Sequence, residues 1–133
     1  MVFDSIVFAG GGNRCFWQAG FWRALEPALA EPPQRMLGVS AGAVVACCVQ
    51  GGVVDRFLEH SCAVFDANTR NFHVLEGMRG RNPFPHPKIL RDGVEAVFDA
   101  SALARLRAGT PVHVLAAVLP RGVPGPLASV AAQ

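Results

Sequence analysis

Residues 8–21 read FAGGGNRCFWQAGF, so three consecutive glycines separate an apolar run from an aromatic-rich segment. The run before them, at residues 5–9, is short, apolar and partly β-branched, which is typical of a strand covered on both faces in a parallel sheet. Apolar residues then recur at helical spacing from residue 15 to residue 29, and the proline pair at 32–33 ends this pattern. Phe16, Trp17 and Phe21 form a second apolar side of the helix, which favours packing inside the protein over contact with lipid. The glycines are therefore predicted to join a strand to a helix.

A second strand-to-helix turn carries a serine between two glycines. Residues 38–42 read GVSAG, after a brief apolar run at 36–39 and before a segment at 41–52 that is small and apolar on all sides, as a buried helix is. In the G-x-S-x-G elbow the serine takes a strained backbone conformation, and Gly38 and Gly42 would let neighbouring chain pass close by. The Ser40 hydroxyl would lie over the positive end of the following helix, where developing negative charge is stabilised. The alternative is an ordinary turn, but this context favours a nucleophile.

The two glycine turns are predicted to act together. A serine that attacks an acyl carbonyl produces an oxyanion, which needs backbone N–H donors already aimed at it. Gly10, Gly11 and Gly12 are predicted to supply them, and Arg14 to brace the loop or assist the charge. Both turns follow parallel strands, so they should lie along one carboxyl edge of the sheet, where ligands bind in open α/β folds. Nucleotide binding is disfavoured, because Cys15 replaces the third glycine of G-x-G-x-x-G and no Gly-Lys-Ser/Thr sequence is present.

The rest of the chain completes an α/β pattern. Helices are expected at residues 54–67, 89–98 and 101–106, and a third buried strand at 111–119. Residues 70–88 are predicted to be irregular because prolines interrupt them; their cations suit an anionic headgroup, although a solvated loop is favoured. The order β-α-β-α-α-β predicts a mainly parallel sheet with crossover helices, and hence an α/β layered fold.

Composition disfavours several classes of function. The 133 residues carry a formal net charge of +2 with 17% charged residues, so nothing favours nucleic-acid binding, and 51% hydrophobic residues suffice for the core of one domain. The four cysteines lack C-x-x-C spacing and are expected to be reduced, mostly buried thiols. No apolar stretch is long enough to span a bilayer and no signal sequence is evident, which predicts a cytoplasmic protein, with peripheral membrane contact left open.

The stretches SIVFAGGGNRCFWQAG and LGVSAGA resemble the patatin-like phospholipase family, and HPKILRDGVEAVFD with LARLRAGTPVHVLAAV is similar to the family's middle portion. The resemblance implies a three-layer α/β/α fold with a mainly parallel sheet. It also implies a lipid acyl hydrolase that uses a Ser-Asp dyad on lipid or phospholipid esters, without histidine, metal or other cofactor. Ser40 would be the nucleophile, with Gly10, Gly11, Gly12 and Arg14 at the oxyanion hole. Residues 1–120 would be the N-terminal portion of the domain, truncated C-terminally, and 121–133 a flexible tail.

The aspartate of the dyad has no clear counterpart. In the family it lies in a D-G-G or D-G-A turn downstream of the third strand, whereas Asp92 lies in a helical pattern, and Asp66 and Asp99 are predicted to be caps or surface charges. The histidines that would complete a Ser-His-Asp triad are favoured as structural or surface residues. They are His60, His73, His86 and His113. Without its base, the chain alone is predicted to be almost inactive. The alternatives are a non-catalytic paralogue that binds lipid or a partner protein, and an acyltransferase; no oligomeric state is predicted.

Overall fold

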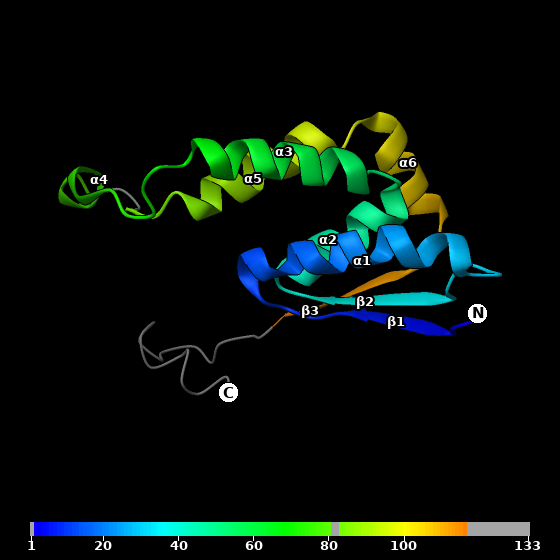
Figure 1. The fold of residues 1–133 in the computed structure, drawn as a ribbon. Helices are drawn as coiled ribbons and strands as arrows, with labels where there is room; N and C mark the ends of the chain where they lie inside the picture. The colour runs from blue at the N-terminus through cyan, green and yellow to red at the C-terminus, as the bar shows by residue number, and fades with distance from the viewer. Residues whose placement is uncertain (1, 81–82, 117–133) are drawn as a thin grey trace.

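A parallel three-stranded sheet forms the base of the protein (Figure 1). The structure is a computed structural model that describes residues 2–80 and 83–116. The strands β1 (Ser5–Phe8), β2 (Arg35–Val39) and β3 (Val112–Leu115) lie in the order β1-β2-β3. Phe8 pairs with Gly38 and Gly38 with Val114, so the carboxyl ends of all three strands lie at one edge. The predicted parallel sheet is confirmed.

Helices make up most of the connections between the strands. A 3-10 turn (η1, Gly12–Cys15), the helix α1 (Phe16–Leu25) and a second 3-10 turn (η2, Glu26–Ala28) join β1 to β2. In the described residues, the helices between β2 and β3 are α2 (Ala41–Gly51), α3 (Val54–Ala67), α4 (Val74–Met78), α5 (His86–Val97) and α6 (Ala100–Ala108). The helices expected at 41–52, 54–67, 89–98 and 101–106 are therefore confirmed to within three residues at each end.

The helix α2 lies at the centre of the hydrophobic core. It contacts all three strands and also α1, α3 and α6, which explains why its sequence is apolar on every side. Val45 and Cys48 are completely buried within it. From the sheet, the Phe8 ring packs on Trp22 of α1 with ring centroids 6.2 Å apart. The turn that carries Ser40 is thus anchored between a core strand and the most buried helix.

The described helices all lie on one face of the sheet (Figure 1). Parallel crossovers are almost always right-handed, and two crossovers that advance in the same direction place their helices on the same face. The opposite face therefore leaves Val7 and Leu115 more than half exposed in the described part of the chain. The α/β fold class is confirmed, whereas the expectation that the first strand is covered on both faces is wrong for these residues. The expectation that the third strand is buried is also wrong for the described residues, because three of the four residues of β3 are exposed. The third layer of the predicted α/β/α arrangement does not lie among them.

The stretch at 70–88 is more regular than its prolines suggested. It contains the short helix α4, and α5 begins at His86 with a proline in its first turn. Proline is tolerated there because the first N–H groups of a helix have no intrahelical partner. The expected tail at 121–133, and residues 117–119 of the third predicted strand, lie outside the described residues.

Two predictions about buried side chains need correction. Trp17 and Phe21 of α1 are 64% and 57% exposed, so they do not pack between the sheet and the neighbouring helices as expected. Of the cysteines, all of which are free thiols, Cys15 and Cys48 are buried but Cys62 is exposed. Burial raises the pKa of the Cys48 thiol to about 12, with a smaller contribution from Cys47 and Cys15, so this group is neutral at physiological pH.

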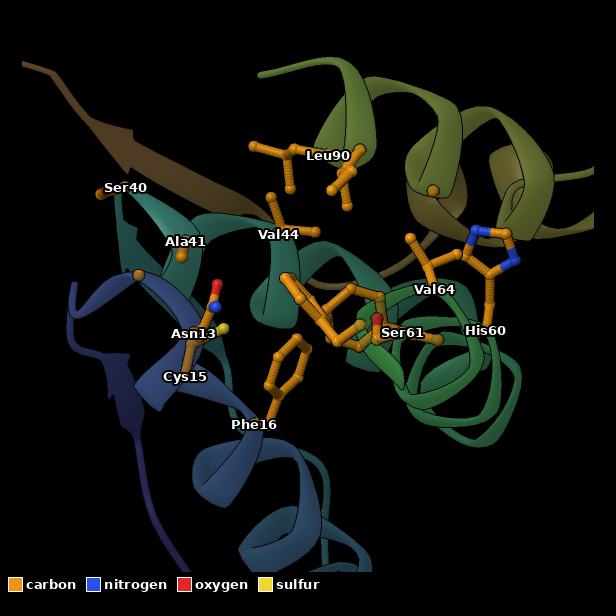
Figure 2. A pocket seen from close by; sticks show the side chains of 15 residues that line it. Asn13, Cys15, Phe16, Ser40, Ala41, Val44, His60, Ser61, Val64 and Leu90 are labelled. Atoms are coloured by element: carbon orange, nitrogen blue, oxygen red, sulfur yellow. The ribbon is translucent and has the colours of Figure 1, made fainter. Parts of the chain in front are cut away.

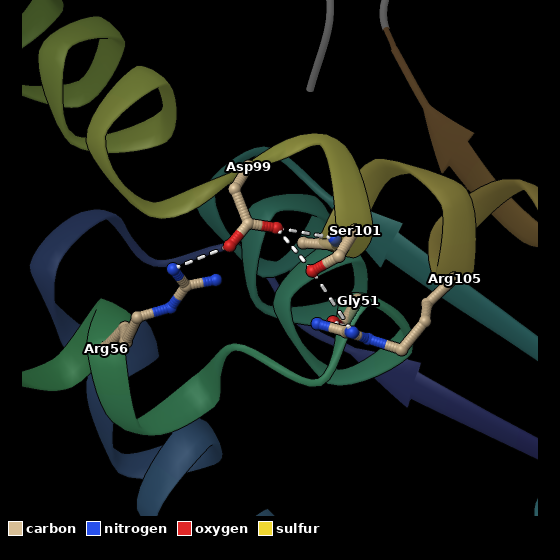
Figure 3. Close-up of polar contacts among 6 residues, drawn as sticks. Gly51, Arg56, Asp99, Ser101 and Arg105 are labelled. Carbon is tan, nitrogen blue, oxygen red and sulfur yellow. Dashed lines mark hydrogen bonds and ion pairs between the residues drawn. The ribbon is translucent and has the colours of Figure 1, made fainter.

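Asp99 caps α6 and connects it to α3 (Figure 3). Its Oδ1 atom accepts hydrogen bonds from Ser101 Oγ (2.7 Å) and from the backbone N–H of Ala102 (2.8 Å), and Oδ2 pairs with Arg56 Nη1 at 2.9 Å. The two hydrogen bonds, together with Arg56, hold the pKa of Asp99 well below its usual range. The sequence interpretation of Asp99 as a cap is confirmed.

Candidate active site

Ser40 lies in a strained turn between β2 and α2. Its backbone dihedrals are φ 53° and ψ −127°, and among the described residues it is the one non-glycine residue with positive φ. Such a conformation costs an L-residue about 1–3 kcal/mol and persists only where the surrounding structure imposes it. The side chain is exposed at the start of α2. This backbone has the character that a nucleophile elbow requires.

The glycines on either side of Ser40 are needed for steric reasons. A β-carbon on Gly42 would lie only 2.5 Å from the carbonyl oxygen of Ala9, because the first turn of α2 crosses the end of β1. A β-carbon on Gly38 would lie 2.7 Å from the backbone nitrogen of Ala43, because α2 doubles back on β2. Side chains at either position would force the helix away from the sheet. The G-x-S-x-G spacing therefore sets how the serine is presented.

The triple-glycine loop lies beside Ser40. The pairing of β1 with β2 ends at Phe8 and Gly38, and just beyond it a β-carbon on Gly10 would lie 3.4 Å from Ser40 Cβ. Gly12 has φ +56°, a conformation that favours glycine, and lines the same cavity as Ser40. The two turns predicted to meet at the carboxyl edge of the sheet are thus neighbours in the structure.

The outer part of the loop is closed by Arg14. Its backbone N–H donates to the Gly11 carbonyl oxygen at 3.2 Å, and its side-chain Nε donates to the same oxygen at 3.4 Å. The guanidinium is exposed and does not line the cavity. Of the two roles considered for Arg14, these contacts favour bracing of the loop.

Gln18 is a further residue that positions the loop, and the motifs did not reveal it. It is buried in α1, and its amide accepts a hydrogen bond from the Ala9 N–H and donates one to the Ala9 carbonyl oxygen, both at 2.8 Å. One side chain therefore satisfies both polar groups of the residue that follows β1, immediately before the glycines. A polar residue at a helix position flanked by buried residues was the available signal.

An apolar cavity of about 440 Å³ extends from Ser40 between α1, α3 and α5 (Figure 2). This volume lies within the usual range for small-molecule sites. Its walls are mainly apolar and aromatic: Phe16, Phe57, Val64, Phe65, Ile89 and Leu90. Cys15 also lines it, and burial raises the pKa of this thiol, so the neutral thiol does not compete with serine as a nucleophile at neutral pH.

No carboxylate lines this cavity in the described residues, which include every Asp and Glu of the chain. Asp92 lies on α5, exposed and paired with Lys88, in the helix that its sequence indicated. Asp66 is exposed on α3. The described structure therefore brings none of the weighed aspartates into this cavity with Ser40.

His60 is the only histidine that lines the cavity within the described residues. Figure 2 places it at the opposite end from Ser40, with Val44 and Val64 between them. Its Nε2 atom is buried and has no hydrogen-bond partner. His60 is thus poorly placed to take a proton from Ser40. The other histidines lie before α4, at the start of α5 and in β3: His73, His86 and His113.

The sequence profile of the family described as Patatin-like phospholipase matches residues 6–129. The chain belongs to the patatin-like phospholipase family. Members of this family are serine lipid hydrolases, and the family implies a lipid ester substrate. Neither the curated proteins nor the solved structures include a significant match. In the described ranges, no helix of this patatin-like chain is long and apolar enough to cross a bilayer, and no three metal-ligating side chains cluster.

Proposed function

We propose that this patatin-like chain is a lipid acyl hydrolase in which Ser40 is the nucleophile. The observation that carries the proposal is the strained backbone of Ser40 beside the glycine loop, at the mouth of an apolar cavity. An acyl chain would occupy the cavity, whose walls offer apolar surface. The ester carbonyl would then lie at Ser40, next to the loop.

The reaction follows from these positions. Ser40 Oγ attacks the acyl carbon, and water or hydroxide takes the Oγ proton because no carboxylate lines the cavity in the described residues. The leaving alkoxide takes a proton from water and departs as the alcohol while the acyl-enzyme forms. Backbone N–H groups of Gly10, Gly11 and Gly12 would stabilise the oxyanion, each contributing up to about 3–4 kcal/mol. Water then releases the fatty acid and restores the serine.

A fluorophosphonate probe tests the nucleophile. We expect it to label the wild-type chain slowly, because no carboxylate lines the cavity in the described residues. It should label the Ser61→Ala variant at the same rate, because Ser61 lines the cavity but is not in the elbow. Labelling should be lost in Ser40→Ala. Persistent labelling of Ser40→Ala would disprove the assignment.

The second candidate function is non-catalytic binding of lipid. It is favoured by the lack of a carboxylate lining the cavity in the described residues. A serine without a base is weakly nucleophilic, so we expect slow ester hydrolysis whose rate rises with hydroxide concentration. A hydrolysis rate that stops rising once the pH exceeds the pKa of a carboxylate would show that this chain supplies a carboxylate base. No labelling of wild type, together with tight binding of a fluorescent fatty acid, would establish the non-catalytic function.

A further inference from the structure

Residues 70–80 and 83–85, here named the arm, project between the ends of α3 and α5. Figure 1 shows α4, the helix of the arm, standing clear of the other helices. The three strands run toward one end of the molecule, and the glycine loop and Ser40 follow the strands at that end. The helix α4 lies beyond this same end. The arm is thus on the same side of the protein as the candidate active site.

The arm is held together by its own contacts. The backbone N–H of His73 donates to the Pro83 carbonyl oxygen at 2.8 Å and closes the base of the arm. Next to this bond, the rings of Phe72 and Phe84 pack edge to face with centroids 5.4 Å apart. Its apolar side chains are therefore presented on a folded segment.

These side chains are strongly exposed. Val74, Leu75 and Met78 are 61%, 66% and 80% exposed, and their spacing of one and four residues places them on one side of the helical turn. Phe72 and Phe84 are more than half exposed as well. Contiguous exposed apolar side chains of this kind mark a surface that binds a partner or a membrane.

Cations are frequent in the arm and in the residues next to it. The sequence between Asp66 and Asp92 holds one acid, Glu76, and five cations, whereas the whole chain nets only +2. The described cations are Arg70, Arg79, Lys88 and Arg91, and all are exposed. Arg79 pairs with Glu76 at 3.3 Å and Lys88 pairs with Asp92, both at the surface. The positive charge of the protein is therefore concentrated at and near the arm.

We propose that the arm docks the protein on an anionic phospholipid bilayer. Exposed apolar side chains with arginine and lysine in and next to the same segment fit the membrane interface, where apolar side chains enter the acyl boundary and cations contact the headgroups. The two helices that carry the arm also line the cavity, through Val64 of α3 and Leu90 of α5. Docking would bring a lipid ester to the end of the molecule that holds Ser40.

The proposal deepens the proposed function, because a lipid hydrolase meets its substrate at an interface, but docking itself does not require Ser40. The test is therefore flotation of the full chain, and of Ser40→Ala, with vesicles of non-hydrolysable diether phosphatidylcholine, with or without diether phosphatidylglycerol. Both proteins should float with the mixed vesicles and much less with phosphatidylcholine alone. Fluorophosphonate labelling in solution reports the nucleophile separately.

Two double variants test the arm. Leu75→Ser with Met78→Ser should lower the partition coefficient at least ~10-fold, because two apolar side chains no longer enter the interface. Arg70→Gln with Arg79→Gln should lower it about 10-fold on the mixed vesicles, and added salt should weaken wild-type binding. The matched control is Val2→Ser with Leu103→Ser, which changes exposed apolar residues at the opposite end and should bind as wild type does.

Four results would overturn the proposal. If the wild-type protein stays in the aqueous phase, it has no affinity for the membrane. If the arm variants float as the wild-type protein does, another part of the protein binds the vesicles. Equal binding to both kinds of vesicle would contradict the role of the cations. A wild-type dimer that Leu75→Ser with Met78→Ser converts to a monomer, without vesicle binding, would assign the arm to a protein interface.

Discussion

The backbone of Gly10 passes directly beside Ser40: a β-carbon on Gly10 would lie 3.4 Å from Ser40 Cβ and 3.2 Å from the Val39 carbonyl oxygen. At the second distance the neighbouring backbone would have to yield by a few tenths of an ångström. The glycine loop can therefore lie this close to the turn that carries Ser40 because Gly10 has no side chain.

Gly10→Ala should slow the reaction of Ser40 with a fluorophosphonate by about 10- to 100-fold, because displacement of the loop would misalign the N–H groups that we propose as oxyanion donors. The matched control is Gly20→Ala in α1, where a β-carbon would meet no atom within 4 Å. That control should label at the wild-type rate and gain up to about 1 kcal/mol of stability, since glycine is unfavourable within a helix. Equal labelling rates for Gly10→Ala and Gly20→Ala would show that the close approach of Gly10 to Ser40 does not matter for the reaction.

Ser40→Gly should stabilise the fold by about 1 kcal/mol relative to Ser40→Ala, because glycine adopts φ 53° without the strain of an L-residue. Urea unfolding of the two variants measures the difference. Both lack the hydroxyl, so neither should react with the probe. If Ser40→Gly is the less stable of the two, the turn is not strained.

Gln18→Glu should destabilise the protein by about 1–3 kcal/mol, because a carboxylate can accept from the Ala9 N–H but cannot donate to its carbonyl oxygen. The labelling rate of Ser40 should fall as well, since Ala9 leads into the glycine loop. Gln50→Glu is the control, because the Gln50 amide makes only a long 3.5 Å contact with the Arg105 carbonyl oxygen. Its unfolding free energy should stay within about 0.5 kcal/mol of wild type.

Asp99→Asn should flatten the dependence of stability on acid pH. The pKa of Asp99 is lowered in the folded state, so its charge stabilises the fold above the ordinary aspartate pKa of about 3.9, and this contribution is lost as the pH falls through the lowered value. Asparagine keeps a capping oxygen but not the charge. Thermal melts from neutral pH to about pH 2 should therefore show a smaller loss for Asp99→Asn than for wild type. Asp66→Asn, at an exposed position of α3, should follow wild type.

The sequence predicted the strands, the long helices and the position of the two glycine turns because each has a local signature. A segment that is small and apolar on all sides indicated the buried helix α2, and the spacing of Gly38, Ser40 and Gly42 indicated the turn between β2 and α2. Exposure of Trp17 was not predictable in this way, since it depends on which face of the sheet the crossovers cover. Gln18 was missed because its partners are backbone groups nine residues away.

The turn that carries Ser40 and the helix α5 both line the cavity, but they differ in how firmly they are packed. Ser40 and the glycine loop are fixed by strand ends and by α2, which touches nearly every other element of the core. By contrast, α5 packs mainly on α3 and contributes Ile89 and Leu90 from the rim of the fold. Tightly packed regions resist displacement, whereas helices with few contacts shift at little cost in free energy. The width of the cavity can therefore change more easily than the position of Ser40. If Ser40 attacks lipid esters as proposed, acyl groups of different widths could be accommodated without displacing its hydroxyl.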